Sequence, residues 1–182
     1  METFVEAKPL IHNSGYHNQR QLALSRLRLE TIDPPILDII KSLVKLPYCF
    51  SLQSCFGHFL YADQTDLQNL EPLPRLEEDT SITYRIAYLA LCVDNSDLGR
   101  QLLKQLNELP SIHPGYIQYG CAQWFWERQI NSYVVQVEPE RHQLKDQCIL
   151  GYQEALIVEK VRYDFFNALR KIFVSRLQQT SR

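Results

Sequence analysis

The stretch SLQSCFGHFLY, residues 51–61, places several groups that can bind or react within a few positions of one another. A serine and a histidine supply hydrogen bonds, a cysteine supplies a thiol, and a glycine allows backbone N–H groups to approach an anion. Its candidate cofactor- or substrate-binding residues are Ser51, Ser54, Cys55, Gly57 and His58. The alternative is a hairpin or bulge in which the cysteine is simply a small core residue.

Covalent chemistry at Cys55 requires a lowered thiol pKa and a base within reach, and His58 three residues later is a candidate base. No G-x-S-x-G elbow or comparable nucleophile motif occurs in the chain. The sequence therefore assigns no catalytic residue, and the stretch is either a ligand-binding turn or a structural hairpin or bulge.

The five cysteines stand at positions 49, 55, 92, 121 and 148, and none is paired as C-x-x-C. An odd number at wide spacing favours reduced thiols in a cytoplasm over a disulfide framework. No close pair of cysteines or histidines opens a zinc-binding motif, so the sequence predicts no metal site.

A second candidate binding position is Tyr119-Gly120, where glycine inside a strand pattern indicates a bulge or a close backbone approach to a ligand. The run QWFWE that follows has two readings. Aromatic side chains can stack nucleobases, but a strand here places Trp124 and Trp126 on one face, which favours core or subunit packing.

The elements that position these residues begin after an irregular lead-in at residues 1–15. A helix is expected over residues 16–30, and Asp33-Pro34-Pro35 predicts the start of a second helix with Asp33 as its N-cap. Period-two alternation predicts a strand over residues 48–53, followed after Gly57 by a returning strand at 58–61.

Residues 62–80 are polar and form one long loop. The apolar run at 81–93 predicts an interior strand, and Asn95 or Ser96 predicts the cap of a helix that stops before Pro110. Two further strands are expected, joined near residues 127–129, and then a long helix over about residues 146–178. This order predicts a single α+β domain with a mixed or antiparallel sheet packed with helices.

The formal net charge is −2, with 19 basic and 21 acidic residues, so any nucleic-acid contact depends on a local patch. Arg20 and Arg26 on the first helix are the candidates for RNA contact, and no DNA partner is expected. The N-terminus has no signal-peptide pattern and no apolar run reaches the length of a bilayer span, which favours a cytoplasmic protein without membrane contact.

The segment from residue 16 to 61 resembles the wybutosine-synthesising methyltransferases that modify tRNA, the third enzyme of that pathway. Ile32-Asp33-Pro34-Pro35-Ile36 is similar to the family's V/I-D-x-x-I step into a second helix. Ser54-Cys55-Phe56-Gly57-His58 is similar to its S-S-C-S-G-R strand end, with Gln53, Phe56 and His58 in place of serine, serine and arginine. Farther on, Tyr119–Cys121 falls where the family has S-G-I.

The resemblance implies methyl transfer from S-adenosylmethionine to a ring nitrogen of tRNA or of another nucleotide-like substrate, with the Ser54–His58 turn lining the pocket. The alternative is a non-catalytic RNA- or protein-binding module that keeps the scaffold. A homo-oligomer formed through the long final helix is a third expectation, because its apolar face is longer than one small sheet needs.

Overall fold

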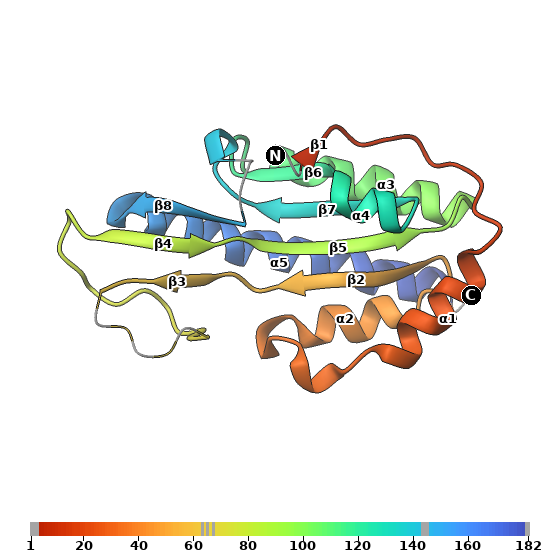
Figure 1. Ribbon diagram of the computed structural model, residues 1–182, viewed down its shortest axis with the longest axis horizontal. Helices are drawn as coiled ribbons and strands as arrows, with labels where there is room; N and C mark the ends of the chain where they lie inside the picture. The colour runs from red at the N-terminus through yellow and green to blue at the C-terminus, as the bar shows by residue number, and fades with distance from the viewer. Residues whose placement is uncertain (1–3, 63, 65, 67, 143–145, 181–182) are drawn as a thin grey trace.

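The computed structural model describes residues 4–62, 64, 66, 68–142 and 146–180 (Figure 1). The strands are β1 Phe4–Val5, β2 Cys49–Cys55, β3 His58–Leu60, β4 Ser81–Arg85, β5 Ala87–Val93, β6 Ile117–Ala122, β7 Ser132–Val137 and β8 Gln147–Gly151. The α-helices are α1 Tyr16–Arg26, α2 Leu37–Val44, α3 Asp97–Glu108, α4 Gln123–Arg128 and α5 Tyr152–Thr180. The predicted α+β class is confirmed.

Two antiparallel sheets are joined end to end by one pair of long chain segments. A five-stranded sheet has the order β1-β6-β7-β5-β2, and a three-stranded sheet has the order β3-β4-β8. β2 pairs with β5 and β3 pairs with β4 in the same register, since Cys55 is opposite Tyr88 and His58 is opposite Arg85. The segments 49–60 and 81–93 therefore form one antiparallel ribbon that runs through both sheets (Figure 1).

Strand β5 is apolar on both faces because each face packs against a different hydrophobic cluster. Ala87, Leu89 and Leu91 belong to the main core, which is completed by α2, α3 and α5. Ala90 packs on the opposite face with Phe4 and Val134. In Figure 1, α5 lies behind the sheet and α4 lies in front of it.

Three details differ from the sequence predictions. Residues 58–60 are not a returning strand, because β3 continues the direction of β2 and pairs with β4 instead of β2. The long helix begins at Tyr152 and not near residue 146, since residues 147–151 alternate between exposed and buried as β8 along the edge of β4. The lead-in of residues 1–15 contains the short strand β1, which pairs with β6.

The run QWFWE is also not a strand. It forms α4, in which Gln123 Nε2 donates to Glu127 Oε1 at 2.9 Å and Arg128 stacks over the Trp124 ring. Contacts between residues four apart outweigh the strand preference of aromatic side chains here. Trp124 and Trp126 consequently do not share a strand face: Trp124 is 51% exposed, whereas Trp126 packs edge-on against Tyr133.

Candidate functional site

A cavity of about 500 Å³ opens where the two sheets separate. At this point the neighbour of the β4–β5 segment changes from β7, which ends at Val137, to β8, which begins at Gln147. The described lining residues are Phe4, Gln53, Cys55, Arg85, Ile86, Tyr88, Ala122, Trp124, Phe125, Val134, Gln136, Glu138, Asp146 and Gln147. Aromatic walls with a few converging polar groups are typical of small-molecule sites.

Tyr84 holds the junction of the sheets beside this cavity. Its hydroxyl donates to the backbone oxygen of Val137 at 3.1 Å and accepts from the backbone N–H of Ala87 at 2.9 Å. These two backbone groups belong to residues that are register partners in β5 and β7. The hydroxyl thus satisfies both groups where regular strand pairing ends.

Glu138 is the most unusual polar group in the cavity, because its side chain is fully buried. Oε2 accepts a hydrogen bond from Gln136 Nε2 at 3.0 Å, whereas Oε1 has no partner among the described residues. Burial, with a smaller contribution from Asp146, raises the pKa of Glu138 to about 8. At neutral pH it is therefore mostly a neutral acid, and its Oε1 is buried in the wall of the cavity.

The strand break at Gly57 comes two residues after Cys55, which lines this cavity. Gly57 has a φ of +88°, and a Cβ at this position would stand 2.9 Å from the Cβ of Ala87. Arg162 of α5 donates from Nη1 to the Gly57 oxygen at 2.7 Å, and its guanidinium lies 4.2 Å from the Phe56 ring centroid. A glycine and a buried arginine together fix the break.

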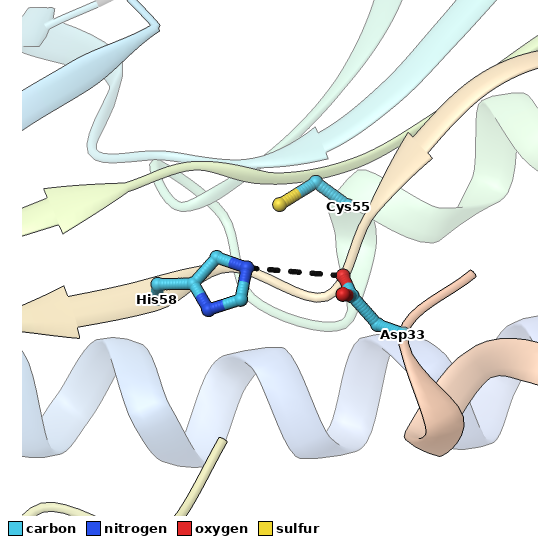
Figure 2. A group of neighbouring side chains, drawn as sticks. All are labelled: Asp33, Cys55 and His58. Atoms are coloured by element: carbon cyan, nitrogen blue, oxygen red, sulfur yellow. Dashed lines mark ion pairs between the residues drawn. The ribbon is translucent and has the colours of Figure 1, made fainter. Parts of the chain in front are cut away.

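Asp33, Cys55 and His58 meet at the same break, with their donor atoms all within 4.8 Å of one another (Figure 2). Asp33 comes from the start of the turn Pro34–Ile36, Cys55 ends β2 and His58 begins β3. Figure 2 shows the carboxylate of Asp33 directed toward the ring of His58, and Nε2 lies 3.8 Å from Oδ2.

Asp33 does not act as the predicted helix cap. It precedes the turn at Pro34, but its side chain makes no capping hydrogen bond there. Instead Oδ2 accepts the backbone N–H of Phe56 at 2.7 Å, which ties the entry to α2 to the strand break. The backbone donor at the strand break competes with the helix N-terminus for this carboxylate.

The structure brings only part of the predicted binding turn to the cavity. Cys55 lines it, whereas Ser51 and Ser54 lie half-buried in β2 opposite Leu91 and Leu89 and are not among the described lining residues. His58 is 3% exposed and belongs to the cluster with the aspartate.

Tyr119 and Gly120 lie in the interior of β6. Tyr119 stacks on Tyr133 with 6.0 Å between ring centroids. A Cβ on Gly120 would approach the backbone oxygen of Val5 to 2.3 Å, so the close backbone neighbour here is β1 of the same chain.

The two candidate RNA-contact residues have different surroundings. Arg20 donates from Nη2 to the backbone oxygens of Val44 and Leu46, at 2.8 and 3.0 Å, and so caps the end of α2. Arg26 is exposed in the last turn of α1.

The cysteines offer no activated nucleophile. All five are free. Burial raises the pKa of Cys55, partly opposed by the hydrogen bond that its sulfur accepts from the Gly57 N–H. Burial also raises the pKa of Cys92 and Cys148 to about 12.

Sequence reasoning missed Glu138 and Arg162, and both carried a signal. Glu138 directly follows the apolar strand SYVVQV, and Arg162 interrupts the apolar face of α5 next to Val161. A charged residue in a stripe that is otherwise buried is the pattern to look for.

The part of the chain that the structure describes contains no helix both long enough and apolar enough to cross a bilayer.

No family model and no curated protein matches the chain. Among solved structures, the chain is similar to the PH1069 protein of Pyrococcus horikoshii, with 11% identity over 90% of this chain and 93% of that one and a TM-score of 0.47. A second PH1069 structure, from Pyrococcus horikoshii OT3, gives 13% identity, 93% and 98% coverage and a TM-score of 0.48. A hypothetical protein of Aeropyrum pernix gives 13% identity, 79% and 96% coverage and a TM-score of 0.41.

Proposed function

We propose that the chain binds S-adenosylmethionine together with a nucleotide-like substrate, such as a base of tRNA, and transfers the methyl group between them. The resemblance of residues 16–61 to the wybutosine-type methyltransferases motivates the reaction. The observation that carries the location is the cavity beside the Cys55 end of β2, with Glu138 in its wall and no partner for Glu138 Oε1 among the described residues.

The lining suits the parts of such ligands. A volume of about 500 Å³ lies in the usual range for cofactor sites, which is roughly 300–1,000 Å³. Tyr88, Trp124 and Phe125 offer aromatic faces to a purine ring. If its side chain turns toward the cavity, neutral Glu138 can donate a hydrogen bond to an unprotonated ring nitrogen, and Asp146 can lie near the positive sulfonium.

Methyl transfer of this kind needs orientation more than a protein nucleophile. The lone pair of the substrate nitrogen attacks the methyl carbon, the carbon–sulfur bond breaks, and its electrons remain on the sulfur as a neutral thioether. A proton on that nitrogen is then lost to solvent. Burial raises the pKa of Cys55 and Cys92, which is compatible with a reaction that uses no cysteine nucleophile.

Titration calorimetry with S-adenosylmethionine tests the proposal. Wild type should bind saturably, Glu138→Gln should retain binding because its amide can still donate, and Glu138→Leu should weaken binding at least about tenfold. Glu77→Leu, at an exposed position outside the cavity lining, is the control. Absence of saturable heat at millimolar ligand, with the protein folded, would overturn the proposal.

A non-catalytic binding module is the second candidate. The observation that favours it is the position of His58, which stands where the family has an arginine yet is buried beside Asp33 and is not among the described cavity residues. Incubation with bulk tRNA and radiolabelled S-adenosylmethionine separates the two. Labelled tRNA supports transfer, and bound tRNA without label supports the binding module.

The oligomer expected through α5 remains a proposal. The apolar face of α5 that motivated it is used within the chain, because Val158, Val161, Phe165 and Leu169 are all buried in the main core. Light scattering coupled to size-exclusion chromatography distinguishes a monomer from a dimer.

A further inference from the structure

We propose that Asp33, Cys55 and His58 form a binding site for a divalent transition-metal ion, with zinc as the best match. The three side chains offer one oxygen, one sulfur and one nitrogen, a ligand set that zinc accepts. They come from three separate elements and are 22 and 3 positions apart along the chain, so no short sequence motif announces them. The inference is independent of the methyltransferase proposal.

The spacing of the donor atoms fits an ion with little adjustment. Two ligands at tetrahedral positions around zinc lie about 3.3 to 3.6 Å apart, given bond lengths of about 2.0 to 2.3 Å. Here Nε2 of His58 and Oδ2 of Asp33 are 3.8 Å apart, and all three donors lie within 4.8 Å of one another. Rotamer adjustments of about 1 Å would complete the geometry.

Each donor is also held by a neighbouring group in the way that metal ligands usually are. Nδ1 of His58 lies 3.4 Å from the backbone oxygen of Asn69, which favours the tautomer that keeps its proton on Nδ1 and leaves the Nε2 lone pair toward Asp33. The Gly57 N–H donates to the Cys55 sulfur at 3.3 Å and so orients it. The Phe56 N–H fixes the Asp33 carboxylate at 2.7 Å.

The electrostatic balance favours an ion of charge +2. A thiolate and a carboxylate together cancel that charge, so the metal complex is neutral beside the buried guanidinium of Arg162. The Asp33 side chain is 21% exposed, which gives the ion a route from solvent. Three protein ligands leave a fourth position for water or another small ligand.

Binding would add a link between segments that already contact one another. Asp33 leads into α2, Cys55 and His58 flank the strand break, and the Asn69 carbonyl comes from the loop between β3 and β4. The ion is therefore expected to stabilise the folded chain.

Cobalt titration of untagged, chelator-treated protein tests the site. Wild type should bind one Co²⁺ with a thiolate-to-metal charge-transfer band and the strong visible bands of tetrahedral cobalt, and Zn²⁺ should abolish both. Zn²⁺ should also raise the melting temperature. Cys55→Ser should lose the charge-transfer band, and Asp33→Asn and His58→Gln should each weaken the apparent affinity at least about tenfold.

The matched control is the second histidine–aspartate contact, His113 Nε2 to Asp164 Oδ2 at 2.8 Å, which has no cysteine in its described hydrogen-bonding contacts. His113→Gln should leave the cobalt spectrum unchanged. The proposal is overturned if folded wild type shows no charge-transfer band at millimolar Co²⁺, or if Cys55→Ser keeps the band. The wild-type spectrum decides the matter even if a variant fails to fold.

Discussion

Arg162 of α5 donates a hydrogen bond of 2.7 Å to the backbone oxygen of Gly57, a residue 105 positions earlier in the chain. The arginine is 5% exposed, and its guanidinium lies over the rings of Phe56 and Phe59. Burial lowers the pKa of Arg162. One side chain thus ties the long helix to the break at which β2 gives way to β3.

Arg162→Met should destabilise the fold by about 1–3 kcal/mol, because it keeps most of the packing but leaves the Gly57 oxygen without its donor. Arg162→Ala should cost more, since it also leaves a cavity between two aromatic rings. Urea unfolding followed by circular dichroism measures both. Lys160→Met, on the same helix but 73% exposed, should change stability by less than about 1 kcal/mol. Equal effects at positions 160 and 162 would contradict this role.

Gly57→Ala should destabilise by more than the cost of a positive φ alone, about 1–2 kcal/mol. The added Cβ meets the Cβ of Ala87, whereas Gly115 has a φ of +81° and nothing within 4 Å of an added Cβ. Gly115→Ala therefore measures the backbone cost by itself. The double variant Gly57→Ala with Ala87→Gly should recover part of the difference. Identical losses for the two single variants would show that the contact with β5 does not matter.

Glu138 should make stability fall as pH rises. Its pKa is about 8 in the folded protein against an ordinary value of 4.5, so between these limits the folded state holds a proton that the unfolded chain has lost. The free energy of unfolding then decreases by up to about 1.4 kcal/mol per pH unit across this window. In Glu138→Gln, the free energy of unfolding should depend less on pH. Chemical denaturation at pH 5, 6.5 and 8 measures it, and parallel curves for the two proteins would refute the assignment.

Substitutions at Arg20 and Arg26 should distinguish a structural role from a role in RNA contact. Arg20→Met removes a charged donor from the carbonyls of Val44, Leu46 and Cys49, which should cost about 1.5–3 kcal/mol. Arg26→Met should leave stability unchanged, because its side chain is exposed. Thermal melts give the comparison, and filter binding to tRNA shows whether either residue matters for RNA. A large loss of stability at position 26 only would reverse the two roles.

Local patterns predicted several elements well because their causes are local. Ser96 caps α3 by accepting from the Gly99 N–H, and Leu102 and Leu106 are buried on its apolar face. The run at 81–93 lies in the interior of the sheets, with β5 between β2 and β7. Helix caps and alternation depend on neighbours within a few residues, and sequence reports these directly.

The candidate sites depended on contacts that no local pattern records. Asp33 has the sequence of a helix cap, yet the N–H of Phe56 takes its carboxylate. The cavity lies where the partner of the β4–β5 segment changes from β7 to β8, and both pairings join residues far apart in the sequence. The direction of β3 was missed because a glycine at positive φ permits both a reversal and a continuation.

The position of α5 in the chain has a consequence for biosynthesis. This helix follows all the strands that the structure describes, yet Phe165, Leu169 and Phe173 belong to the core beneath the sheets. While a ribosome is still translating residues 152–180, α5 does not yet cover the strand face that carries Leu89, Leu91 and Val135. A nascent chain stalled after β8 should therefore recruit a holding chaperone, and one extended through α5 should release it.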